Sequence, residues 1–144
     1  MDPRDFLDLA KKLSGGSTAA EYRTAISRAY YATYHVGAAF LKDIGCPISA
    51  GPQAHGEVRN DLSNCGDAEL AGVGSQLADL HKKRIIADYR LTDVKYDNQK
   101  TSQAVTVQAG RMIQALDRCG SGSRRDEIAR AVNKYLRILG YPFD

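Results

Sequence analysis

Apolar residues recur along most of this chain at steps of three and four, the spacing that gathers them on one face of an α-helix. The longest such pattern runs from Thr18 to Ile44. A Thr18–Glu21 capping-box pattern opens it, and Gly45-Cys46-Pro47 closes it. Further helices are predicted over residues 3–13, 52–64, 67–89, 99–118 and 124–139. Four substantial helices with short connections predict an all-α fold, an antiparallel up-down helical bundle with additional short helices.

Three parts of this prediction rest on weaker signals. Residues 101–107 are rich in β-branched side chains, which favour strands, but the length of the segment and its helical second half predict a helix. Residues 91–98 are rich in turn-forming side chains and are predicted to form a loop. Ser123 is expected to cap the last helix, which Gly140 and Pro142 should end.

Length and composition indicate a single domain that covers residues 1–144. The net charge of +3 permits contact with RNA without requiring it, and no dense run of Lys and Arg is present. The longest apolar run, Val36 to Leu41, is too short to span a membrane, and the first residues lack the layout of a signal peptide. We therefore expect a cytoplasmic protein with no membrane contact.

The three cysteines, Cys46, Cys65 and Cys119, are widely separated and form no Cys-x-x-Cys pair. This spacing argues against a zinc site and against a disulfide framework. We expect buried, reduced thiols, and the sequence carries no motif that would hold a metal or another cofactor.

The segment Ser27–His35 reads Ser-Arg-Ala-Tyr-Tyr-Ala-Thr-Tyr-His inside the longest predicted helix. Arg28 and His35 are seven residues apart, so they lie two turns apart on nearly the same face. A guanidinium that can hold a phosphate and a base that titrates near neutral pH would thus share one stripe. The alternative is that both residues only hydrogen-bond neighbouring helices, while Tyr31 and its neighbouring tyrosines pack in a core or interface.

A second group of candidate residues ends the helix predicted over residues 67–89. Arg84 and Asp88 are four residues apart, Tyr89 follows them, and His81 stands one turn before Arg84. The cations that surround this turn are Lys82, Lys83 and Arg90. Such a concentration of positive charge would suit a phosphate. A plain ion pair on the helix surface explains Arg84 and Asp88 equally well.

Two further pairs of residues have simple structural interpretations. His55 and Arg59 stand at helical spacing, and we interpret them as a solvated or interhelical contact, with a place in a site as the alternative. Arg124 and Arg125, near the start of the last helix, are expected on the surface.

Three pieces of the chain resemble, in this order, the HEPN proteins, which are small prokaryotic helical domains. The pieces are Arg28-Ala29-Tyr30-Tyr31-Ala32 with the following His35, Ala54-His55-Gly56-Glu57-Val58, and Arg84-Ile85-Ile86-Ala87-Asp88-Tyr89. The resemblance covers about residues 5–118 and implies a bundle of HEPN type. It also implies chemistry, because HEPN ribonucleases cut RNA as dimers and without a metal.

The HEPN nuclease motif is an arginine followed after four to six residues by a histidine. Arg28-x6-His35 fits this spacing but lies on the second predicted helix, whereas the family's motif sits at the start of a later helix. The segment with that later placement is Arg84–Tyr89, in which Asp88 stands and no histidine follows. An aspartate is normally ionised at neutral pH and cannot donate a proton there.

By this resemblance we expect a HEPN-type toxin or defence effector, a metal-independent endoribonuclease that acts as a homodimer. The candidate catalytic residues are Arg28, His35 and Arg84, and the candidates for the cleft or for modification are Asp88, Tyr89, Tyr31 and His81. One alternative is a catalytically degenerate HEPN partner of a minimal nucleotidyltransferase, which would add AMP to Tyr89. The other alternative is a structural helical adaptor.

Overall fold

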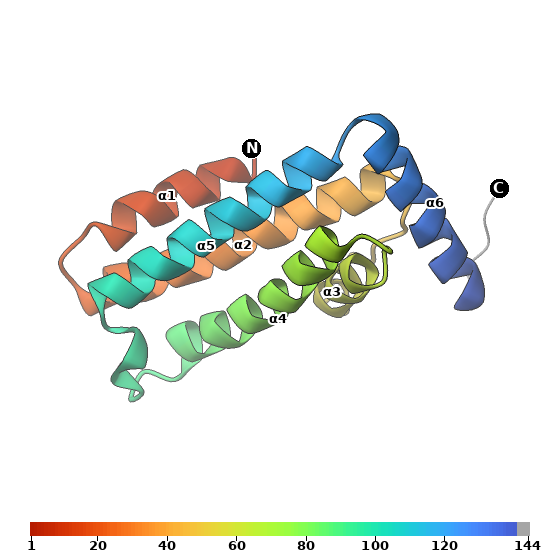
Figure 1. Cartoon of the computed structure of the whole chain (residues 1–144). Coiled ribbons are helices and arrows are strands. Elements are labelled where there is room, and N and C mark those ends of the chain that lie inside the picture. Colours follow the sequence, from red (N-terminus) through yellow and green to blue (C-terminus); the bar gives the residue numbers. More distant parts are fainter. Residues whose placement is uncertain (141–144) are drawn as a thin grey trace.

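A computed structural model describes residues 1–140 of the chain as a bundle of α-helices (Figure 1). The helices are α1 (Arg4–Ser14), α2 (Ala19–Asp43), α3 (Ala54–Ser63), α4 (Ala68–Tyr89), α5 (Gln99–Cys119) and α6 (Gly122–Ile138). A short 3-10 helix, η1 (Val94–Tyr96), interrupts the segment between α4 and α5 that was predicted to be a loop. Residues 1–140 contain no β-strand, so the prediction of an all-α bundle is confirmed.

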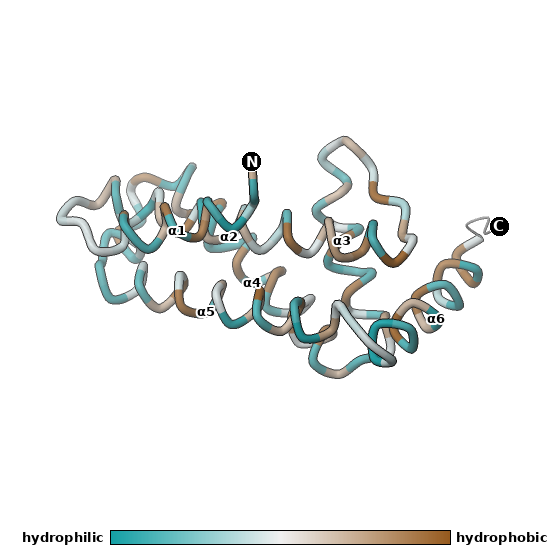
Figure 2. The backbone as a smooth tube through the Cα atoms, turned by 90° about the horizontal axis from the view of Figure 1, so that it is seen from above, coloured by the Kyte–Doolittle hydropathy of each residue, from teal (hydrophilic) through white to brown (hydrophobic). Residues whose placement is uncertain are grey.

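Helix α2 is the central element of the bundle, and α1, α4 and α5 all pack along it. Successive long helices run in opposite directions, while α3 lies beside α4 and α6 projects at an angle from one end (Figure 1). Hydrophobic positions alternate with hydrophilic ones along each helix, as the tube coloured by hydropathy shows (Figure 2). This alternation lets each helix turn one face to its neighbours and the other to solvent.

The start of α2 is fixed by the predicted capping box. The hydroxyl of Thr18 accepts a hydrogen bond from the Glu21 backbone N–H, and the Glu21 carboxylate accepts one from the Thr18 N–H. These bonds satisfy two backbone donors that the first turn of a helix otherwise leaves unpaired. The bond from the Thr18 side chain also lowers the pKa of Glu21.

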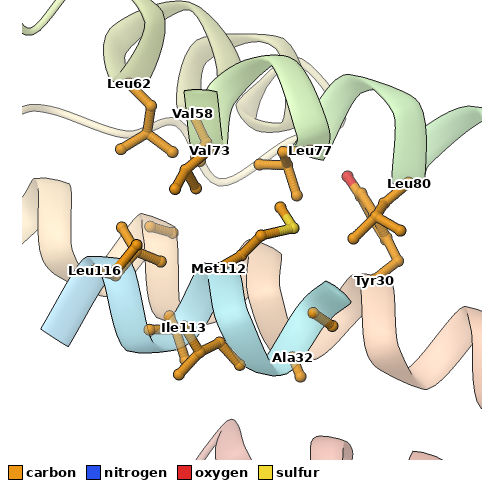
Figure 3. Packing of buried hydrophobic residues seen from close by; sticks show 14 of the residues in the cluster. Tyr30, Ala32, Val58, Leu62, Val73, Leu77, Leu80, Met112, Ile113 and Leu116 are labelled. Atoms are coloured by element: carbon orange, nitrogen blue, oxygen red, sulfur yellow. The ribbon is translucent and has the colours of Figure 1, made fainter. Parts of the chain in front are cut away.

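The core lies between α2, α4 and α5. Leu77 of α4 faces Met112 of α5, Leu80 of α4 lies beside Tyr30 of α2, and Leu116 lies further along α5 (Figure 3). All five side chains are at most 2% exposed. Full burial of an aliphatic side chain of this size contributes about 1.5–3 kcal/mol relative to leaving it in water.

A glycine of α4 permits the close approach of α3. A Cβ at Gly74 would lie 2.9 Å from the Arg59 carbonyl oxygen and 3.0 Å from the Ser63 backbone nitrogen, so no larger residue fits without a shift of backbone. Sequence propensity marks Gly74 as a weak point near the start of α4. In the structure it sets the distance at which α3 presents its side chains to α4.

Two hydroxyl groups in the first half of α5 are paired with backbone carbonyls. The Ser102 hydroxyl donates to the Tyr22 carbonyl of α2, and the Thr106 hydroxyl donates to the Ser102 carbonyl within α5. Helix α5 starts at an Asn98 cap, whose side chain accepts from the Thr101 N–H. The prediction of a helix over residues 99–118 is therefore confirmed.

The start of α6 differs from the prediction. Ser123 is not the cap, because α6 begins at Gly122, which has a φ of 69° that a residue with a side chain rarely adopts. Arg124 and Arg125 also do more than cover surface: they form ion pairs with Asp67 and Asp43, which join α6 to the rest of the bundle. Pro142 lies outside the described residues.

The three cysteines are buried and free, as expected. None of the helices within residues 1–140 combines the length and the apolar character that crossing a membrane requires.

Candidate functional site

The three histidines of the chain lie together, although each comes from a different helix. His35 belongs to α2, His55 to α3 and His81 to α4. The rings of His55 and His81 are 5.5 Å apart, measured between their centroids. Tyr34 lies between His35 and His55. Its ring is stacked on His55 at 4.3 Å and set edge-on to His35 at 5.0 Å. We call the three histidines, together with Tyr30, Tyr31 and Tyr34, the histidine cluster.

Tyr30 forms the floor of the histidine cluster. Its side chain is fully buried, its hydroxyl oxygen lies 2.5 Å from Nδ1 of His55, and its ring lies 5.3 Å from that of His81. Burial raises the pKa of Tyr30, so the hydroxyl keeps its proton at neutral pH. A protonated phenol with an imidazole nitrogen at this distance holds the His55 ring in one orientation.

Arg59 fixes the protonation state of His81. Its Nη1 lies 3.2 Å from Nδ1 of His81. A guanidinium can only donate, so Nδ1 must accept, and Nε2 then carries the proton of the neutral ring. These bonds engage Nδ1 of both His55 and His81 and leave their Nε2 atoms without a hydrogen-bond partner within residues 1–140.

All three histidines favour the neutral form. Partial burial lowers the pKa of His35, His55 and His81, and nearby cations lower each of them further. Arg84 and Arg59 act on the pair of His55 and His81. At neutral pH the three rings are consequently mostly uncharged, and those of His35 and His55 can accept a proton.

Tyr31 brings together the candidate catalytic residues. The guanidinium carbon of Arg28 lies 4.9 Å from the centre of the Tyr31 ring, and that of Arg84 lies 5.1 Å from it. The ring of His35 is 6.2 Å away. The predicted shared stripe of Arg28 and His35 is therefore present, and the fold adds Arg84 from another helix.

Asp88 orients Arg84. The predicted pair at helical spacing exists, with Nε of Arg84 2.9 Å from Oδ2 of Asp88, and both side chains are partly buried. The Ser27 hydroxyl donates to the same carboxylate oxygen at 3.0 Å. Tyr89 lies on the other side of Arg84, with 5.5 Å between the guanidinium carbon and the ring centre. An exposed ion pair would contribute little, but this one is held by a third residue and fixes a guanidinium in place.

Arg23 anchors the end of α4 that carries these residues. Its guanidinium is buried and donates to the carbonyl oxygens of Ala87 at 3.0 Å and Arg90 at 3.2 Å, where the helix leaves carbonyls unpaired. It also donates to the Asp93 carbonyl and pairs with Asp97, 2.5 Å from Nε to Oδ1. The Arg23 side chain of α2 thus supplies hydrogen-bond donors to backbone carbonyls in the last turn of α4 and in the loop after it.

Sequence reasoning left several of these residues without a role in the site. His55 and Arg59 do not form the pair within α3 that their spacing suggests, because His55 bonds to Tyr30 and Arg59 bonds to His81. Both residues therefore make interhelical contacts, one of the interpretations that the sequence suggested. Arg23 lies five residues before Arg28, and nothing in its local sequence marks it as buried.

The histidine cluster does not form a set of metal ligands. In the described part of the chain, no group of three or more His, Cys, Asp or Glu side chains is arranged to hold a metal ion.

Comparison with known proteins gives no match: neither a protein-family model, nor a curated protein, nor a solved structure matches this chain. The resemblance to HEPN proteins therefore stays a prediction from the sequence, and the site has to be interpreted from its own geometry.

Proposed function

We propose that this protein is a metal-independent endoribonuclease of HEPN type, a toxin or defence effector that acts as a homodimer in the cytoplasm. The observation that carries the proposal is the convergence of all three histidines with three arginines from three helices. The arginines are Arg28, Arg59 and Arg84. Cleavage of RNA at its own 2′-hydroxyl needs groups that move protons and cations that hold the phosphate, and this surface offers both.

The proposed reaction is an attack of the ribose 2′-oxygen on the adjacent phosphorus. His55 takes the proton of the 2′-hydroxyl at Nε2, since its ring is neutral and its Nδ1–H donates to the Tyr30 oxygen in the tautomer that the reaction uses. The bond from phosphorus to the 5′-oxygen breaks, and the protonated fraction of His35 delivers a proton to that leaving oxygen. Exchange of protons with water then returns both histidines to their starting forms. The products are a 2′,3′-cyclic phosphate and a free 5′-hydroxyl, and no metal or redox partner takes part.

The cations stabilise the charge that builds on the phosphate. Arg28 and Arg84 flank the Tyr31 ring and present planar guanidinium groups, which match two phosphate oxygens at once. His81 has its Nδ1 engaged by Arg59, so its Nε2–H is a neutral donor to the same oxygens. Such donors act where charge develops in the transition state.

A second candidate function rests on the exposure of Tyr89. Its side chain is 70% exposed, so its hydroxyl is accessible to another protein. A minimal nucleotidyltransferase partner would transfer AMP from ATP to that oxygen and release pyrophosphate. Mass spectrometry after incubation with such an enzyme and ATP would show one added AMP on the parent and none on the Tyr89→Phe variant.

The experiment that tests the proposed function is incubation of the purified protein with total RNA and with tRNA in EDTA. We expect cleavage and 2′,3′-cyclic phosphate ends. Arg84→Lys should cut more slowly because lysine keeps the charge and loses the planar fork. Arg130→Lys, an exposed change on α6, should cut like the parent. Intact RNA after prolonged incubation of the folded parent would refute the proposal.

A further inference from the structure

Five side chains from three helices form a row in which aromatic rings alternate with guanidinium groups. The order is Phe6, Arg28, Tyr31, Arg84 and Tyr89. The guanidinium carbon of Arg28 lies 4.8 Å from the Phe6 ring centre and 4.9 Å from that of Tyr31. The guanidinium carbon of Arg84 lies 5.1 Å from Tyr31 and 5.5 Å from Tyr89. We call this row the cation–π ladder.

The two ends of the cation–π ladder differ. Phe6 at one end is half-buried and packs against the core, whereas Tyr89 at the other end is 70% exposed. Packing within the bundle explains the position of Phe6 and Tyr31. It does not explain Tyr89, whose ring contacts Arg84 and leaves most of its surface in water.

The exposed end is held firmly. Arg84 is bonded to Asp88, Asp88 is bonded to Ser27, and Arg23 holds the last carbonyls of α4. The Tyr89 ring therefore sits on an anchored turn, and a ligand that stacks on it loses little of its binding energy to ordering the protein. Arg90 follows Tyr89 directly, and Lys82 stands two turns earlier on nearly the same face of α4, so the ligand that fits is both planar and anionic.

We propose that the cation–π ladder is a stacking platform for single-stranded RNA, with an unpaired base on the Tyr89 ring and backbone phosphates on Arg28 and Arg84. The choice of RNA rests on the proposed function, while the stacking rests on the ladder alone. Single strands combine a phosphate backbone with free base faces, and each base stacked on an aromatic side chain contributes about 1–3 kcal/mol. In a duplex the bases stack on one another and cannot reach Tyr89.

The platform would also determine where the strand is cut. Tyr31 belongs both to the ladder and to the histidine cluster, because its ring contacts Arg28 and Arg84 as well as His35. A base held on Tyr89 consequently places the phosphates that follow it along the arginines toward the histidines. The preferred substrate is an unpaired segment, such as a loop or a free end, rather than a helix.

The absence of tryptophan from the chain permits a direct test. Tyr89→Trp makes residue 89 the sole tryptophan, and a stacked base quenches its fluorescence. The probe is a 2′-O-methyl RNA decamer, which cannot be cut because its 2′-oxygen carries no proton. We expect quenching by the single-stranded decamer and much less by the same decamer in a duplex. Val107→Trp, an exposed position on α5, is the matched control and should show no quenching.

Binding of the same decamer, followed by fluorescence anisotropy, gives the strength of the stack. We expect Tyr89→Ala to weaken binding by about tenfold or more, and Tyr89→Phe to bind like the parent. Equal affinity of Tyr89→Ala and the parent, or equal binding of single strand and duplex, would overturn the platform. Absence of quenching in Tyr89→Trp at saturating decamer would overturn it as well.

Failure of the platform and failure of the proposed function are distinguishable. Because the decamer is uncleavable, quenching in a protein that never cuts RNA supports the platform and refutes the nuclease. Cleavage of RNA by Tyr89→Ala with the rate and affinity of the parent supports the nuclease and refutes the platform.

Discussion

The hydroxyl of Tyr30 lies 2.5 Å from Nδ1 of His55 and ties the longest helix of the bundle to the short helix α3. Tyr30 is fully buried, whereas His55 is only partly buried. The bond therefore joins the core to the surface on which the histidines meet. In the proposed reaction it holds the ring that accepts the 2′-hydroxyl proton.

Replacement of Tyr30 by Phe tests this relationship. The phenyl ring keeps the packing and removes the hydroxyl, so we expect a loss of about 1 kcal/mol in the free energy of unfolding, the net worth of one hydrogen bond. Cleavage of RNA should slow as well, because the His55 ring loses its orientation. Urea unfolding followed by circular dichroism measures the first effect. An unchanged cleavage rate would show that Tyr30 does not position His55 for the reaction.

Replacement of Arg23 should lower the free energy of unfolding more than most other single substitutions in the chain. Arg23→Met keeps most of the apolar stem, but it leaves Asp97 and several carbonyls at the end of α4 without a partner. We expect a loss of about 3 kcal/mol or more in the free energy of unfolding, as for other broken buried ion pairs. Arg118→Met removes an exposed ion pair with Glu69 and should cost less than about 1 kcal/mol. Similar losses for the two variants would contradict this account of Arg23.

The helices could be predicted from the sequence because their signals are local. The Thr18–Glu21 capping box and the apolar stripe of α2 are readable within a few residues, and the structure places both as predicted. The error at Ser123 has the same origin, since a serine near a helix start looks like a cap. In the structure α6 starts at Gly122, one residue before the predicted cap. The positive φ of Gly122 is visible only in the three-dimensional path of the chain.

The candidate site could be predicted only in part. Arg28 and His35 share a helix face, so their spacing alone brings them together. Arg84 joins them through Tyr31, and this requires α2 and α4 to pack in one particular register. The bonds of His55 to Tyr30 and of Arg59 to His81 each cross between helices. Such contacts depend on helix packing, which a single sequence does not specify.

The stability of the protein should depend on Asp61, a buried carboxyl group of α3. Burial, together with the Glu57 carboxylate one turn earlier, raises the pKa of Asp61 to about 6. An acid whose pKa is raised on folding binds its proton more tightly in the folded state. The charged Asp61 carboxylate therefore lowers the free energy of unfolding by its full amount above pH 6. This loss disappears as the pH falls below the ordinary pKa of 3.8.

Asp61→Asn mimics the protonated group and should be more stable than the parent by about 1–2 kcal/mol at pH 8, after allowance for solvent screening. The gain should vanish near pH 4. Urea unfolding of both proteins from pH 4 to pH 8 measures it, and the histidines titrate equally in the two proteins. Asp79→Asn, an exposed change on α4, should show no such trend. A gain for Asp61→Asn that does not vary with pH would contradict the assignment.

Assembly into a homodimer is a further prediction. The histidine cluster carries Tyr31 and Tyr34 at a partly exposed surface, and tyrosines are enriched at protein interfaces. Two copies related by a twofold axis would place two clusters against each other. Light scattering of the isolated chain should give twice the monomer mass at tens of micromolar, on the order expected for a modest interface. A monomer under these conditions would argue against the dimer.

The most direct test of the account is the rate at which His35→Ala and His55→Ala cut single-stranded RNA in EDTA. We expect each variant to cut about two to four orders of magnitude more slowly than the parent, the usual worth of acid–base catalysis. Circular dichroism at 222 nm should show that both variants keep the helical content of the parent. If both cut as fast as the parent while remaining folded, these histidines are packing residues and the proposed reaction is wrong.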